Sequence, residues 1–227
     1  MGQASVREYR PNLYKKIIST ASDLIYKYEF WTNKEICGRL TVVYYDKLMQ
    51  YNVDDLTNAS MMIGVSARNL GKYDKEDICL DIINHYEKRI DLLQKIINAV
   101  KDNKKKIDMA SSGPVCTSVD KYIDDFYICQ KYNGIWLNQE QYKKVIDKLK
   151  KNGIEEYWLK YISGIENKWS QYMKMLFKII EEIKSDISMQ SKITTDYLNK
   201  LNDDVNLIIK KMDYITDIYY LMAVNII

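Results

Sequence analysis

Turn-forming residues are scarce in this chain. Among its 227 residues there are only 8 glycines and 2 prolines, which is well below average usage. Because these residue types end helices and form tight turns, their scarcity argues against a fold with frequent turns. We therefore expect few turns and long elements, in one domain or two small ones.

Residues that bind metals or act in catalysis are also few. His85 is the single histidine, and no CxxC motif occurs among the four cysteines, which are Cys37, Cys79, Cys116 and Cys129. No zinc-ligand spacing is present, and one histidine removes most catalytic triads. Adjacent acids such as Asp124 and Asp125 point about 100° apart on a helix, so they do not converge on one substrate atom. We expect no catalytic site, no metal site, no cofactor and no enzymatic activity.

The same cysteines suggest no disulfide framework. Three of the four fall within predicted helices, and no secretory signal peptide is recognisable at the N-terminus. Buried free thiols in a reducing compartment are the simplest interpretation. We therefore expect no disulfide bond.

Long apolar runs and a strong excess of one charge are absent too. No stretch reaches the roughly 18 apolar residues that a membrane span needs. The net charge is only +3, with acids and bases interspersed. The densest basic runs, at 104–106 and 143–151, are interpreted as solvated loop and helix faces. A nucleic-acid partner is therefore not expected.

What the chain has in abundance is helical periodicity of its apolar residues. The pattern predicts helices over 11–30, 33–51, 54–63, 75–101, 119–132, 139–151 and 155–163. From 165 to 227 there is no glycine or proline, so this part is either one long helix or two antiparallel helices joined near 188–192. The predicted fold class is all-α, a multi-helix bundle with a long C-terminal helix or a helical hairpin.

Composition suggests one boundary within the bundle. Residues 104–118 are first highly charged and then contain Ser111-Ser112-Gly113-Pro114, which is typical of a linker. The expected organisation is a flexible N-terminus at 1–10, a helical subdomain at 11–103, the linker at 104–118, and a second helical subdomain at 119–227.

The last predicted helix carries a continuous apolar stripe. Its positions alternate by three and four residues: Leu198, Leu201, Val205, Ile208, Met212, Ile215, Tyr219, Met222. Such spacing over several heptads is typical of a coiled-coil seam that binds a protein partner or a second copy of the chain. Packing of the stripe into the chain's own bundle fits equally well. The four tryptophans are expected in the core.

The N-terminus is the most informative short segment. Met1-Gly2-Gln3 would expose Gly2 for N-myristoylation, although Ser5 lies one place before the position where the motif has Ser or Thr. We expect Gly2 to be acylated. Because a single acyl chain anchors only marginally, Lys15-Lys16 and the apolar face of the first helix would supply a second contact. The expected partner there is a membrane surface, bound peripherally through the N-terminus.

One helix pattern has a counterpart in a known group. The run from Lys34-Glu35-Ile36-Cys37 to Tyr44-Tyr45-Asp46-Lys47-Leu48 resembles helical virion-associated proteins of nucleocytoplasmic large DNA viruses. Val115-Cys116, Asp124-Asp125-Phe126 and the segment at 172–177 follow in similar order.

This resemblance implies a non-enzymatic structural virion protein, close to a membrane in some members, in the virion and the host cell cytoplasm. Two alternatives stay open. One is a helical adaptor that binds host or viral proteins through its C-terminal helix, and the other is a nucleic-acid packaging protein that uses its lysine runs.

Overall fold

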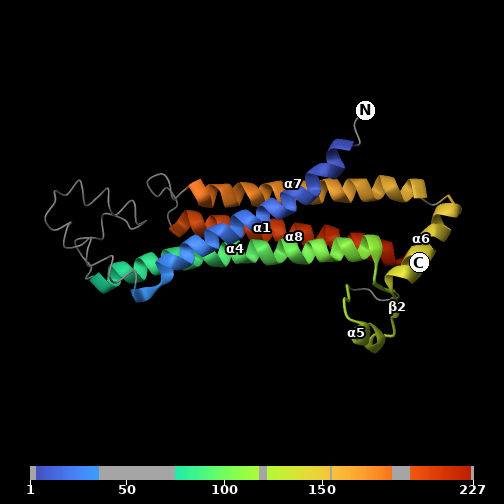
Figure 1. The fold of residues 1–227 in the computed structure, drawn as a ribbon, viewed down its shortest axis with the longest axis horizontal. Helices are drawn as coiled ribbons and strands as arrows, with labels where there is room; N and C mark the ends of the chain where they lie inside the picture. Colours follow the sequence, from blue (N-terminus) through green and yellow to red (C-terminus); the bar gives the residue numbers. More distant parts are fainter. Residues whose placement is uncertain (1–3, 36–74, 118–121, 154, 186–194, 226–227) are drawn as a thin grey trace. The chain divides into compact units, whose positions relative to one another are not determined.

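The structure, a computed structural model, describes residues 4–35, 75–117, 122–153, 155–185 and 195–225. Its elements follow in chain order: α1 (Ala4–Thr32), α4 (Lys75–Ser112), β1 (Val115–Thr117), α5 (Phe126–Lys131), β2 (Ile135–Leu137), α6 (Gln139–Lys151), α7 (Glu155–Ser185) and α8 (Thr195–Asn225) (Figure 1). Helices dominate, with one two-stranded sheet among the described residues. The predicted all-α fold class is confirmed.

The chain divides into two compact units. Unit 1 consists of Met1–Ile97 and Leu176–Asn206, and unit 2 of Asn98–Met175 and Leu207–Ile227. The three long helices α4, α7 and α8 each contribute residues to both units. The units are therefore discontinuous in sequence, which differs from the expected division into 11–103 and 119–227.

Unit 1 is a helical bundle made by α1 and by segments of α4, α7 and α8. The α1 side chains that recur every three or four residues are buried in it: Leu13, Ile17, Ala21, Leu24 and Tyr28. Tyr28 connects α1 with two other helices, since its ring centroid lies 5.2 Å from that of Tyr86 and its hydroxyl donates to the Ile183 carbonyl at 3.3 Å. Burial of each large apolar side chain contributes about 1.5–3 kcal/mol.

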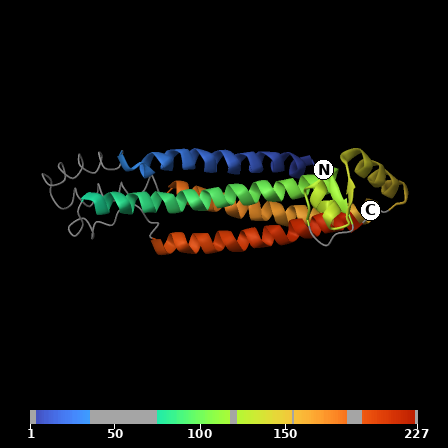
Figure 2. The ribbon, with the colours of Figure 1, turned by 90° about the horizontal axis from the view of Figure 1, so that it is seen from below.

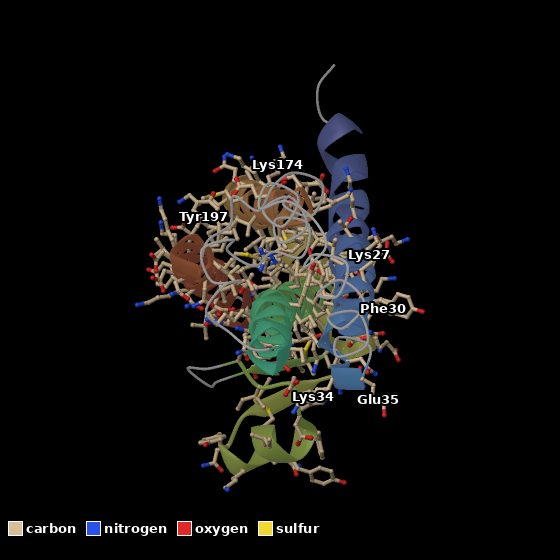
Figure 3. The ribbon with its side chains drawn as sticks, turned by 90° about the vertical axis from the view of Figure 1, so that its left-hand side faces the viewer. Lys27, Phe30, Lys34, Glu35, Lys174 and Tyr197 are labelled. Carbon is tan, nitrogen blue, oxygen red and sulfur yellow. A yellow bond between two sulfur atoms is a disulfide. The ribbon has the colours of Figure 1, made fainter. Side chains whose placement is uncertain are left out.

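The α7 and α8 helices are separate and run antiparallel within unit 1. The Tyr197 hydroxyl, in the first turn of α8, donates to Glu182 near the end of α7 at 3.1 Å. Lys95 of α4 donates to Asn202 and Asn206 of α8, at 2.8 and 3.0 Å. In the end-on view the unit 1 helices surround a shared interior, and Phe30 of α1 points away from it (Figure 3). Of the two arrangements left open for 165–227, the helical hairpin is the one observed.

Unit 2 contains the sheet and the shorter helices. Strands β1 and β2 pair antiparallel, with Val115 opposite Leu137. Helix α6 has the predicted bounds of 139–151 and begins with a capping box in which the Asn138 and Gln141 side chains bond to each other's backbone N–H. It ends before Gly153, whose φ of +73° is the left-handed conformation that a helix C-terminus favours. Figure 2 shows the second view of these elements.

Several predicted boundaries are wrong. The expected linker at 104–118 is instead the last part of α4 followed by β1, and α1 already begins at Ala4 within the segment expected to be flexible. Helix α4 continues through its charged run because each lysine there has an acidic partner: Asp108 for Lys104, Asp124 for Lys105, and Asp217 for Lys106.

Two further predicted helices differ in length from the observed ones. The helix expected over 119–132 is reduced to the six residues of α5, and the helix expected over 155–163 is the start of α7. The helices predicted over 33–51 and 54–63 lie almost wholly outside the described residues.

A candidate interaction site on a disulfide-linked module

A small module leaves the helices of unit 2 after α4. It consists of β1, α5 and β2, and we call it the disulfide module, because Cys116 of β1 and Cys129 of α5 form a disulfide with a Cα–Cα distance of 5.8 Å. Both cysteines are fully buried. The expectation of free thiols is therefore wrong for this pair. The predicted long helix over 119–132 hid the contact, because it kept Cys129 on a helix apart from Cys116.

One tyrosine hydroxyl anchors the disulfide module to the helices, and a second one joins two helices of unit 2. Tyr220 of α8 accepts from the Cys116 backbone N–H at 3.0 Å and donates to the Ile123 carbonyl at 3.3 Å. Burial raises the pKa of Tyr220, so the hydroxyl keeps its proton. Tyr142 of α6 donates to the Ala110 carbonyl at 2.5 Å, and burial raises the pKa of Tyr142 to about 12. The module is thus fixed to α8, and the start of α6 is fixed to the end of α4.

The outer surface of the module is unusually apolar. Of the eleven large hydrophobic side chains that the described residues expose, five lie between 126 and 135: Phe126, Tyr127, Ile128, Tyr132 and Ile135. We call this set the aromatic tip. Large side chains of this kind present about 150–250 Å² each, so at their exposures of 42–77% the five give roughly 500 Å² of apolar surface.

Local structure explains why these side chains face outward. In the short helix α5 it is Cys129 that is buried, so Phe126, Tyr127 and Ile128 lie on the remaining faces. Along β2 the exposed Ile135 is followed by the partly buried Trp136. The Phe126 ring lies edge-on to Tyr127 and to Trp136, with centroid distances of 5.4 and 6.3 Å. The rings of Phe126, Tyr127 and Trp136 therefore form one cluster.

The charges next to the tip are engaged in local contacts. Asp125 caps α5 by accepting from the Ile128 backbone N–H at 2.9 Å. Asp124 pairs with Lys105, and the hydrogen bond from Lys105 lowers the pKa of Asp124. Between 126 and 135 only Lys131 carries a charge. The aromatic tip is therefore close to electrically neutral.

A polar network connects α4 with α8 elsewhere in unit 2. The Asn103 side-chain amide donates to Asp213 at 2.8 Å and accepts from the Thr216 hydroxyl at 2.9 Å. Lys106 lies 2.8 Å from Asp217. Asn103 and Thr216 are buried and hydrogen-bonded, so the network orients one helix against the other. We assign it a structural role.

The predicted seam on the last helix is part of the chain's own interior. Seven of its positions are buried: Leu198, Leu201, Val205, Ile208, Met212, Ile215 and Tyr219. The eighth, Met222, is partly buried. Of the two interpretations of this stripe, packing within the bundle is therefore the one observed. A buried side chain presents no surface to a partner, so the expected assembly surface is corrected here.

The structure also bears on the second membrane contact that was expected from the first helix. Gly2 lies outside the described residues. The apolar face of α1 is buried in unit 1, and the Lys16 ammonium lies 4.5 Å from the centre of the Phe177 ring. That face is therefore occupied by the bundle and cannot supply the second membrane contact. Of the tryptophans expected in the core, Trp169 is buried and Trp136 is partly buried.

The described residues offer little for other chemistry. They contain no group of three or more His, Cys, Asp or Glu side chains placed to hold a metal ion. In the same part of the chain, no helix is both long enough and apolar enough to cross a bilayer. No family model, no curated protein and no solved structure matches the chain. The aromatic tip is therefore the surface feature on which a functional argument can be built.

The sequence did contain a signal for this site. Phe126-Tyr127-Ile128 stands directly after two aspartates, and Ile135-Trp136 follows Asn133-Gly134. An apolar cluster between such turn signals fits a short surface loop as well as a helix. The prediction of one helix over 119–132 did not single these residues out as a surface.

Proposed function

We propose that this chain is a non-enzymatic structural protein that uses the aromatic tip as its contact surface within a larger assembly. The assembly that we propose is the particle of a large DNA virus, and the sequence resemblance to virion-associated proteins of such viruses supports this choice. The observation that carries the proposal is the concentration of five exposed apolar side chains on one small module held by a disulfide.

Exposure of these apolar side chains to water is unfavourable in free energy unless a partner covers them. Exposed apolar surface of roughly 500 Å² on one small module is comparable in area with the largest apolar patches of typical monomers, which are often functional. Aromatic residues are also enriched at interfaces. The disulfide and the Tyr220 hydroxyl hold the tip in position before it binds, so less conformational entropy is lost on contact.

The adaptor alternative does not gain comparable support. It requires the apolar stripe of α8 to be available, and seven of those side chains are buried within the chain. A binding surface on the disulfide module requires no opening of the bundle.

The proposal can be tested by particle composition. Particles of the encoding virus, purified from cells that express the wild-type chain, should contain it at a copy number comparable with that of other structural proteins. A double variant, Tyr127→Ser with Ile135→Ser, should be depleted from particles. The matched control is Tyr26→Ser with Leu207→Ser, because Tyr26 is 80% exposed against 77% for Tyr127, and Leu207 is 52% exposed against 60% for Ile135.

Two results would contradict the proposal. One is the absence of the chain from purified particles. The other is equal incorporation of the tip variant and the control variant, since the tip would then make no contact that holds the chain in the assembly.

A further inference from the structure

Helix α6 concentrates positive charge. Within its thirteen residues there are five lysines and two acids, so this one helix has as large a positive excess as the whole chain, whose net charge is +3. The lysines are exposed: Lys143, Lys144, Lys148, Lys150 and Lys151. Lys144 pairs with Glu140 of the same helix at 2.8 Å.

The basic helix and the aromatic tip belong to the same end of unit 2. Helix α6 begins two residues after β2, and the Tyr142 hydroxyl holds its first turn to Ala110 near the end of α4. The disulfide module starts from that same end of α4, at Val115. The basic helix therefore follows directly in the chain on the module that carries the aromatic tip.

The chemistry of this pair matches the surface of a bilayer. Tyrosine and tryptophan favour the interfacial layer of a membrane, where an apolar ring and a polar group are both accommodated. Basic side chains beside such a surface are attracted to anionic headgroups.

We propose that the aromatic tip inserts into the interfacial layer of a bilayer that contains anionic lipid, while the α6 lysines contact the headgroups. The inference rests on the proposed function in one respect, that the tip is a contact surface. It names the occupant of that surface.

Two properties of the tip favour a lipid surface over other macromolecules. A protein partner would have to meet the tip with an apolar face and the α6 lysines with acidic groups, whereas a bilayer that contains anionic lipid supplies both. Nucleic acid would engage the lysines but would leave the branched aliphatic side chains Ile128 and Ile135 exposed to water. A bilayer accommodates both the lysines and these side chains at once.

The test is flotation of the full chain, with its disulfide intact, on phosphatidylcholine vesicles with and without phosphatidylserine. Bacterial expression leaves Gly2 without an acyl group, so binding reports on the folded surface. Wild-type protein should float with the vesicles that contain phosphatidylserine. Tyr127→Ser with Ile135→Ser should lower the partition coefficient by about tenfold or more, and Tyr26→Ser with Leu207→Ser should not change it.

The contribution of the α6 lysines is tested by a separate pair of substitutions. Lys148→Gln with Lys151→Gln should reduce binding to vesicles that contain phosphatidylserine by about fivefold to thirtyfold, and raising the salt concentration should act in the same direction. Binding to pure phosphatidylcholine should change little. Circular dichroism checks that each variant keeps its fold, which is expected because every substituted side chain is exposed.

The depth to which the tip inserts is measured through the fluorescence of Trp136, whose ring lies edge-on to that of Phe126 in the tip. Brominated phosphatidylcholine should quench part of the tryptophan fluorescence of the wild-type protein on phosphatidylserine-containing vesicles, and this quenching should be lost in Trp136→Phe. Equal quenching of the two proteins would show that the tip does not enter the bilayer and would overturn the inference.

The remaining outcomes separate this inference from the proposed function. Failure of wild-type protein to float, or equal flotation of the tip variant, overturns the lipid inference. If the same tip variant is nevertheless depleted from particles, the tip is a protein contact and the proposed function stands. If flotation depends on the tip while particle incorporation does not, the lipid inference stands and the proposed function fails. Salt-sensitive DNA binding without flotation assigns α6 to nucleic acid and also overturns the inference.

Discussion

The anchoring of the disulfide module by Tyr220 gives a sharp quantitative prediction. Tyr220 is fully buried, and its hydroxyl serves two backbone groups, the Cys116 N–H and the Ile123 carbonyl. In Tyr220→Phe the ring stays but both hydrogen bonds are lost. A buried backbone group left without a partner costs about 1–3 kcal/mol. We expect the free energy of unfolding of unit 2 to fall by roughly 2–3 kcal/mol, since one donor and one acceptor lose their partner together.

The assay compares this variant with Tyr214→Phe. Tyr214 is on the same helix but is 68% exposed, so loss of its hydroxyl should change stability by less than about 0.5 kcal/mol. Urea unfolding followed by circular dichroism gives the difference in stability. Hydrogen exchange locates it, because the Cys116 amide should exchange faster in Tyr220→Phe than in the wild-type protein.

A specific result would refute this reasoning. If the two variants unfold at the same urea concentration and the Cys116 amide keeps its protection, the hydroxyl does not hold the module, and the disulfide alone must position the tip. Conversely, a large loss of stability with unchanged exchange at Cys116 would place the effect of Tyr220 in the helix core rather than at the module.

Four further predictions follow from the same contacts. Cys116→Ser with Cys129→Ser should destabilise unit 2 by about 3 kcal/mol, the loop-closure value for a separation of 13 residues, with the loss read from urea unfolding. Because burial raises the pKa of Tyr142 to about 12, its contribution is complete below pH 10 and is lost as the pH rises toward 12; alkaline titration of unfolding should show a loss of stability, and Tyr142→Phe should make that loss smaller, the remainder coming from groups such as Tyr220 whose pKa is also raised. Ile208→Asp places a charge in the interior and should unfold the chain, and light scattering that instead showed a dimer dissociating into folded monomers would contradict the observed packing. Acylation of Gly2 in eukaryotic cells remains a prediction, and an intact mass without a fourteen-carbon acyl group would refute it.

The disulfide also bears on where the chain folds. Disulfides persist in oxidising surroundings and are rare where thiols are kept reduced. The expectation of free thiols assumed a reducing compartment, and the Cys116–Cys129 bond contradicts that expectation for this pair. We therefore expect the bond to be present in the native protein, which gel mobility with and without a reductant measures directly.

Helical periodicity and the scarcity of turn residues were sufficient to predict the fold class. Local signals such as the capping side chain of Asn138 and the left-handed Gly153 act within a few residues, so the bounds of α6 could be predicted from sequence alone. The separation of the last two helices was one of two arrangements that the pattern allowed. The structure contains the antiparallel arrangement, in which the Tyr197 hydroxyl of α8 donates to Glu182 of α7.

The candidate site depended on contacts between residues far apart in the chain. A stripe of apolar residues looks the same whether it packs inside a bundle or against a partner, so burial of the α8 stripe was decided only by the helices around it. The aromatic tip was not predicted, because the segment was interpreted as one helix, whereas the bond between Cys116 and Cys129 and the Tyr220 hydroxyl hold it as a separate module. Sequence determined which residues are apolar and with what period, because that is a local property. Tertiary structure decided which of them face water, because exposure depends on every neighbour that the fold brings close.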